Sequence, residues 1–182
     1  MLMRVFGGYN RLLHAYPLIT QCTTTGVLLA AGDVIAQKGV EKQEQWNWKR
    51  TAKFGAFGLL FIGPVIRNWL VFLERAFGET GKWTPIKKVL ADQLCFNPVL
   101  QFTALPVLGV MNGETMAQIR ANIEKNYVDI MIAAWKLWPF VALFNFYLVP
   151  LNYRLPVVAL VSLVWNIYYT WKLGEKGEQK HN

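Results

Sequence analysis

Charged residues are scarce in this sequence, and acidic residues are the scarcer kind. The chain has 19 Lys and Arg residues against 11 Asp and Glu residues, and charged residues make up 16% of it. Soluble domains carry about 25%. Hydrophobic residues reach 54%, so the composition favours a protein that crosses a membrane several times. The alternative is a soluble bundle of unusually apolar helices.

Several kinds of active site lack their essential residues. The two histidines, His14 and His181, lie at opposite ends of the chain, which argues against a histidine metal site or a Ser-His-acid arrangement. Cys22 and Cys95 lie in apolar segments and are too few for a disulfide framework. No GxxxxGK or GxGxxG loop is present. We therefore expect no enzymatic activity, no cofactor and no metal site.

The longest apolar run, residues 131–171, contains no acidic residue. A bilayer core about 30 Å thick needs about 20 mostly apolar residues per helix. The run is therefore long enough for one full span near 135–151 and a shorter second piece near 155–171. The prolines that divide it are Pro139, Pro150 and Pro156.

Three further apolar windows precede this run. They cover residues 17–37, 54–73 and 89–110. The segment 112–129 is soluble in character and predicts at most a short amphipathic helix. The predicted fold is all-α, a polytopic membrane helical bundle of four spans. Whether 155–171 crosses as a fifth span stays open.

The two ends of the chain differ from the predicted bundle at 16–171. Residues 1–15 form a basic amphipathic segment with Arg4 and Arg11 and no acidic residue. We interpret it as an uncleaved helix lying on the membrane surface, with a mitochondrial targeting segment as the alternative. Residues 172–182 are charged and are predicted to be a disordered tail.

Polar side chains inside the apolar windows are the candidate functional residues. Gln93, Asn97 and Gln101 recur every four residues and so form one stripe along a helix. Such a stripe lines a water-filled path or else forms hydrogen bonds between helices. The full candidate pore or polar-network set is Asp33, Gln37, Arg67, Asp92, Gln93, Asn97, Gln101, Asn145 and Arg154.

Arg67 lies well inside its window, where an unpartnered arginine costs several kcal/mol. We favour snorkelling, or an ion pair with Asp33 or Asp92, over a direct role in transport. If these residues instead line a pore, Arg67 and Arg154 would attract anions, while the two aspartates would gate or balance them.

Several motifs together resemble the Mpv-seventeen and peroxisomal-membrane-protein-twenty-two family. Residues 32–37 resemble its GDxxxQ motif, and Gly63-Pro64 resembles its glycine-proline bend. Lys88, Asp92-Gln93 and Pro98 resemble KxxxDQxxxxP. The segment 135–154, from Trp135-Lys136-Leu137-Trp138-Pro139 to Arg154, resembles its WxxWP…NFxxVPxxxR signature. The sequence departs from the family at Arg67, where relatives usually have His, and at Ala142, where they often have Gln.

The resemblance implies a small protein of the mitochondrial inner membrane, with the peroxisomal membrane as the alternative. It also implies a weakly selective channel for small metabolites, linked to mitochondrial homeostasis. The rival hypothesis is a non-transporting scaffold that binds partner proteins. Expected partners are membrane lipids and small solutes, and a homo-oligomer is compatible with the sequence. The net charge of +8 is attributed to contact with lipid headgroups, and no nucleic acid is expected.

Overall fold

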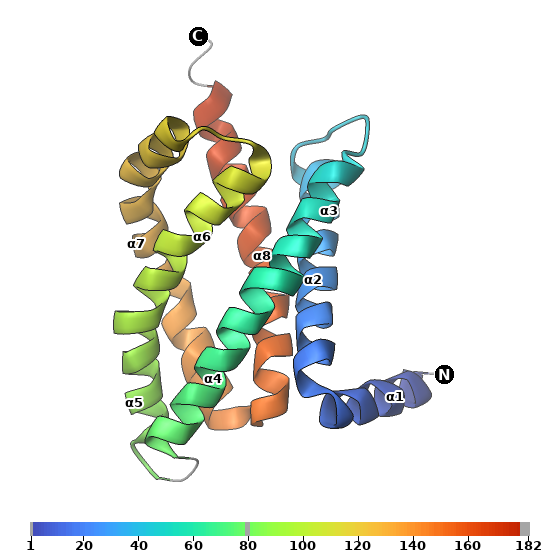
Figure 1. Cartoon of the computed structure of the whole chain (residues 1–182), viewed down its shortest axis with the longest axis vertical. Coiled ribbons are helices and arrows are strands. Elements are labelled where there is room, and N and C mark those ends of the chain that lie inside the picture. The colour runs from blue at the N-terminus through green and yellow to red at the C-terminus, as the bar shows by residue number, and fades with distance from the viewer. Residues whose placement is uncertain (1, 79–80, 179–182) are drawn as a thin grey trace. The chain divides into compact units, whose positions relative to one another are not determined.

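The computed structural model describes residues 2–78 and 81–178, and the regular secondary structure in this part of the chain is helical, with no strand (Figure 1). The α-helices are α1 (Leu2–Ala15), α2 (Pro17–Ile35), α3 (Trp48–Phe57), α4 (Gly63–Phe77), α5 (Thr84–Ala91), α6 (Asn97–Asn112), α7 (Met116–Leu148) and α8 (Leu151–Glu178). Three π-helical turns are η1 (Ala36–Val40), η2 (Gly58–Ile62) and η3 (Asp92–Phe96). The predicted all-α class is confirmed.

Four helical stretches within the described ranges are long and apolar enough to cross a membrane. They are Pro17–Gly39, Trp48–Phe77, Thr84–Met111 and Met116–Leu148. The four predicted spans are confirmed, although their bounds differ. The apolar part of α8 that can be assessed, Leu151–Trp165, is shorter than any of these.

The fourth span is longer than predicted. α7 has 33 residues and already begins at Met116, where the sequence predicted a separate soluble segment over 112–129. Thr115 and Gln118 form a capping box that fixes this start. At about 1.5 Å per residue α7 is about 50 Å long, so it extends beyond a core of about 30 Å.

Two of the three prolines do not divide the apolar run as predicted. α7 continues through Pro139, and Pro156 lies inside α8. The break is at Val149, which is extended with φ −105° and ψ 124°. Pro150 follows it, and proline disfavours the helical conformation in the residue before it.

Two π-helical turns are explained by prolines that follow them. A proline ring clashes with the carbonyl four residues earlier in an α-helix. For Pro64 and Pro98 these carbonyls belong to Leu60 in η2 and Leu94 in η3. A π-helical turn widens the helix at this point and accommodates the ring without ending the span.

The predicted disordered tail is partly helical. α8 continues to Glu178, so residues 172–178 extend a helix that is already formed. Extending a helix needs no new nucleation, which is the unfavourable step. Residues 179–182 of the predicted tail lie outside the described residues.

The chain divides into two compact units, and the sequence contains no signal for this division. Unit 1 comprises residues 1–68 and 151–182, and unit 2 comprises residues 69–150. The boundary between Asn68 and Trp69 falls inside α4. The contacts described below lie within one unit or the other.

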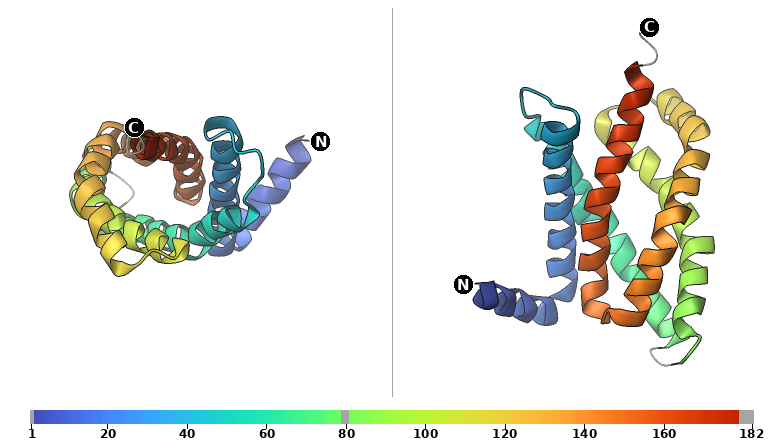
Figure 2. Two further views of the ribbon diagram at one scale, coloured as in Figure 1. Left: turned by 90° about the horizontal axis from the view of Figure 1, so that it is seen from above. Right: turned by 180° about the vertical axis from the view of Figure 1, so that it is seen from behind.

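In unit 1, α2 packs against both α3–η2 and α8. A Cβ added at Gly58 would lie 2.9 Å from Gly26 Cα, so these helices touch through their backbones. α8 runs parallel to α2, because Gln21 contacts Asn152 while Gly32, further along α2, lies against Leu163, further along α8 (Figure 2).

The contact between Gln21 and Asn152 uses a carbonyl that Pro156 leaves without its helical donor. In an α-helix the carbonyl of Asn152 would accept from the N–H of residue 156, which proline lacks. Gln21 Nε2 donates to this carbonyl at 2.7 Å instead. Gln21 is fully buried, so this side chain joins α2 to α8 in the interior of unit 1.

In unit 2, α7 packs antiparallel to the run formed by α5, η3 and α6. Tyr127 Oη donates to the carbonyl of Pro98 at 3.1 Å, and Trp135 Nε1 donates to that of Gln93 at 3.2 Å. In the π-helical turn the carbonyl of Gln93 would accept from the N–H of residue 98, five residues later, which proline lacks. Trp135 of α7 therefore supplies the missing donor at Gln93, while Tyr127 adds a bond to the first turn of α6.

Candidate functional site

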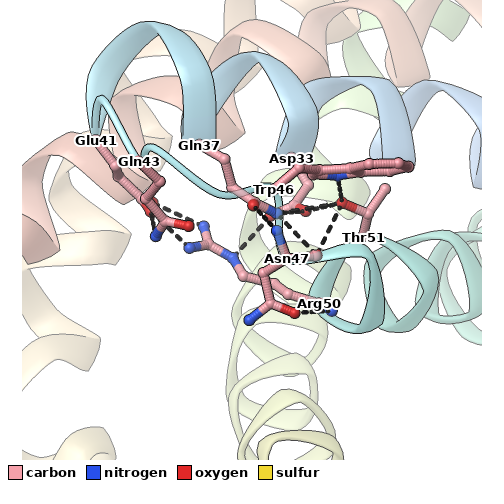
Figure 3. A network of polar contacts seen from close by, with 8 residues as sticks. All are labelled: Asp33, Gln37, Glu41, Gln43, Trp46, Asn47, Arg50 and Thr51. Atoms are coloured by element: carbon pink, nitrogen blue, oxygen red, sulfur yellow. Dashed lines mark hydrogen bonds and ion pairs between the residues drawn. The ribbon is translucent and has the colours of Figure 1, made fainter.

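The most extensive polar network in the described ranges lies in unit 1, where α2 ends and α3 begins (Figure 3). Asp33, with a side chain 1% exposed, lies at its centre. Asp33 Oδ1 is 2.8 Å from Arg50 Nε. Asp33 Oδ2 accepts from Gln37 Nε2 at 2.6 Å and from Thr51 Oγ1 at 2.7 Å. The carboxylate thus has both a cation and neutral donors in a buried position.

Arg50 connects this carboxylate to a second one. Its Nη1 and Nη2 donate to the two oxygens of Glu41 at 2.7 and 2.8 Å. This bidentate geometry is the arrangement that a guanidinium group favours. Arg50 therefore bridges Asp33, on α2, and Glu41, in the connector after η1.

The same network fixes the connector to α3. Gln37 Oε1 accepts from the backbone N–H of Asn47 at 2.8 Å. Asn47 Oδ1 accepts from the backbone N–H of Arg50 at 3.0 Å and caps α3. Trp46 Nε1 donates to Thr51 Oγ1 at 2.9 Å. These bonds hold α2, the connector and α3 together, so the network acts as a structural lock at one end of α2.

A second polar group forms a row in unit 2. Asp92 accepts from Trp69 Nε1 at 2.8 Å and from Gln93 Nε2 at 2.7 Å. Asn97 Nδ2 donates to Gln93 Oε1 at 3.3 Å, and Gln101 Nε2 donates to Asn97 Oδ1 at 3.4 Å. The predicted stripe is therefore a chain of hydrogen bonds along one helical run, ending at a carboxylate.

Two features distinguish this polar row from the Asp33 network. Its amides bond to one another four residues apart on the same run, and the last two bonds are long and weak. In addition, no ion pair involves Asp92 within the described ranges. The row has little interhelical bonding and leaves its one carboxylate without a cation.

A buried ion pair lies one turn before the row. Lys88 and Glu74 pair in unit 2, and Lys88 is 2% exposed. Asp92 lies four residues after Lys88 on the same helical run, but is not part of this pair. The pair joins the end of α4 to α5.

The remaining predicted residues fall into different places. Arg67 is partly buried on α4 in unit 1. Asn145 and Arg154 are 2% and 7% exposed, on α7 and α8. The predicted ion pair of Arg67 with Asp33 is wrong, because Asp33 is paired with Arg50.

No pattern in the sequence predicted that four further residues belong to the Asp33 network: Arg50, Thr51, Glu41 and Asn47. A usable signal was present for one of them, since an asparagine just before Trp48 is a typical N-cap. Gln21 was not predicted either, because its partner is the Asn152 carbonyl that Pro156 leaves open, far away in the sequence. No cluster of His, Cys, Asp and Glu within residues 2–78 and 81–178 could hold a metal.

Comparison with known proteins identifies the family. Residues 109–170 match the Mpv17 / PMP22 family. The mitochondrial inner membrane protein Mpv17 of Rattus norvegicus is 40% identical over 172 residues, which cover 93% of this chain and 98% of that protein. The chain belongs to the Mpv17 / PMP22 family. The resemblance predicted from the sequence motifs is thus confirmed.

Other relatives of the Mpv17 / PMP22 family agree. Mitochondrial inner membrane protein Mpv17 of Danio rerio is 37% identical over 90% of this chain and 94% of its own length. Protein SYM1 of Gibberella zeae is 36% identical, with the same coverage of both chains. No solved structure matches this chain.

Family membership and the four apolar spans together define the location. This is a multi-pass protein of the mitochondrial inner membrane, as predicted. None of the relatives just described is named as a protein of the peroxisomal membrane, the other predicted location. The Gly32 to Gln37 motif on which the resemblance to the Mpv17 / PMP22 family rested contributes Asp33 and Gln37 to the structural lock.

Proposed function

We propose that this protein forms or gates a weakly selective channel for small metabolites across the mitochondrial inner membrane. The observation that carries the proposal is the polar row from Asp92 to Gln101. A row of amides in an apolar span is expensive unless it serves the fold or contacts water and solute. These amides bond mainly along their own helical run, so the fold gains little from them.

The row also bears on selectivity. The sequence predicted a preference for anions because of Arg67 and Arg154, but Asp92 is the charged member of the row itself. Amides accept and donate equally well, so they discriminate weakly between polar solutes. The proposed path would therefore conduct small cations and neutral solutes at least as readily as anions.

Cysteine modification provides the test. Gln101→Cys, in a background without Cys22 and Cys95, is reconstituted in planar bilayers and treated with a charged thiol reagent. The matched control is Thr103→Cys. Thr103 is exposed and about 200° further around the helix than Gln101. Reaction should reduce conductance at position 101 and leave it unchanged at position 103.

The proposal fails if the purified protein gives no conductance above protein-free bilayers. It also fails if both positions respond equally, because the row would then not line the path. A change in pore size on reaction would be visible as a change in unitary conductance, which separates blocking from loss of protein.

A non-transporting scaffold is the second candidate, and the Asp33 network favours it. Asp33, Gln37 and Thr51 are buried and bonded between α2, the connector and α3, as expected for residues that only lock the fold. Asn97→Ala discriminates between the two functions. A lower unfolding temperature in a protein that gives no conductance above protein-free bilayers supports the scaffold, and altered conductance with near-normal stability supports the channel.

A further inference from the structure

Arg67 is a cation that the described structure leaves partly without a partner. Its Nη1 atom is buried, and no group within residues 2–78 and 81–178 accepts a hydrogen bond from it. None of the ion pairs in these ranges includes Arg67. A buried donor on a charged group is costly when it is unpaired, and because Arg67 as a whole is only partly buried, an acceptor from outside the chain can approach its guanidinium group and stabilise it.

The packing of unit 1 fixes the level of Arg67 along α2. A Cβ at Gly58 would touch Gly26, and a Cβ at Gly63 would lie 2.9 Å from Cys22 Cα. Moving forward along α4 therefore means moving back along α2. Arg67 follows Gly63 by about one turn, which places it level with the first turn of α2.

This level is one edge of the membrane. The first span, Pro17–Gly39, has 23 residues and is about 34 Å long, close to the thickness of the apolar core. α1 leaves the start of α2 at a steep angle, as expected of a helix on the membrane surface (Figures 1 and 2).

Specific contacts hold α1 at the corner where it meets the start of α2. Leu13 is fully buried, and the hydroxyl of Tyr153, on α8, pairs with Asn10 Oδ1. Arg11 and His14 remain exposed, and no acidic residue occurs before Asp33. α1, the first turn of α2 and Arg67 therefore lie at one level, where residues 1–32 contribute bases and no acid.

We propose that Arg67 binds the phosphate group of an anionic phospholipid at this corner, with α1 lying across the adjacent headgroups. The depth matches, because phospholipid phosphates lie at the edge of the apolar core. The chemistry matches as well, because a guanidinium fork fits phosphate oxygens better than a lysine ammonium does. Basic pockets between helices at a membrane face are typical sites for such headgroups. The site is independent of the proposed channel.

The test measures binding of anionic phospholipid to the purified full-length protein in a zwitterionic detergent. Phosphatidylglycerol or cardiolipin should raise the unfolding temperature, and phosphatidylcholine should not. Arg67→Gln should weaken this response about ten-fold in lipid concentration, the loss expected for one charge-assisted contact. Arg67→Lys should weaken it less. Arg75→Gln, an exposed arginine further along α4, is the matched control and should respond as the unmodified protein does.

Inorganic phosphate distinguishes the two possible sources of the phosphate group, a lipid headgroup and a free anion. If it raises the unfolding temperature as much as the lipid does, the site takes a free anion and the lipid proposal is overturned. An equal response of the Arg67→Gln and Arg75→Gln variants overturns it as well. If Arg67→Gln does not fold, a photoactivatable anionic phospholipid decides. Crosslinks should map to α1 and the Arg67 region of α4, and crosslinks elsewhere refute the site.

Discussion

Removing the guanidinium group of Arg50 should destabilise the fold more than removal of any surface arginine. Arg50→Gln takes the cation from Asp33, whose side chain is 1% exposed, and from Glu41, which is 21% exposed. Leaving a buried charge unpaired costs about 3–5 kcal/mol. Arg50 is itself 25% exposed, and Asp33 keeps its donors Gln37 and Thr51, so we expect about 2–3 kcal/mol.

Unfolding of the purified protein by a denaturing detergent, followed by circular dichroism, measures this cost. The control is Arg120→Gln, which removes the same group from an ion pair with Glu124. Both side chains of that pair are well exposed, at 82% and 64%. An exposed pair of this kind contributes about 0.5 kcal/mol or less.

A double variant tests whether the cost arises from the unpaired carboxylate. Asp33→Asn removes the buried charge, so adding it to Arg50→Gln should recover part of the lost stability. The reasoning is refuted if Arg50→Gln costs no more than Arg120→Gln. Strict additivity of the two single variants would also refute it, because contacting residues should couple.

Three further outcomes test the packing of unit 1. Gly58→Ala should cost about 1–3 kcal/mol in detergent unfolding, since its Cβ would lie 2.9 Å from the α2 backbone, whereas Gly39→Ala has open space and should be neutral. Gln21→Leu should cost about 1–3 kcal/mol, because the Asn152 carbonyl loses its donor. Adding Pro156→Ala restores a backbone N–H for this carbonyl and should reduce the loss of stability. If the double variant recovers no stability, Gln21 does not replace the missing N–H. α8 runs parallel to α2 and reaches η1 at the far end of α2, so it should cross the membrane as a fifth helix beside the four longer spans. Cysteines placed in α1 and near the end of α8 should therefore react from opposite faces of sealed vesicles; labelling of both from one face would contradict this.

The sequence predicted the parts of the site that depend on helical spacing alone. Asp33 and Gln37 are four residues apart on one helix, and the structure brings their side chains together. The predicted stripe from Gln93 to Gln101 is likewise a row. Arg50 was missed because its contact with Asp33 depends on how the connector between η1 and α3 folds, and no periodicity encodes that path.

Hydropathy predicted that the four spans exist, but it did not predict where they begin and end. Hydropathy detects the apolar middle of a helix, which is the part of α7 that the sequence assigned correctly. The first half of α7 is polar because it extends beyond the apolar core, and polar composition suggested a separate segment. The capping box at Thr115 was the signal that would have placed the start of the helix.

The prolines show why composition alone misjudges where a membrane helix ends. In the apolar core no water can satisfy freed backbone groups, so the chain stays helical and adapts locally. Pro64 and Pro98 follow π-helical turns, and Pro156 leaves a carbonyl that Gln21 takes. Pro150 immediately precedes α8, and the start of α8 lies beside the second turn of α2. Pro150 is therefore near the membrane edge, where water can form hydrogen bonds with backbone groups that have no helical partner. The depth of a proline in the bilayer, more than the proline itself, therefore decides whether the helix ends.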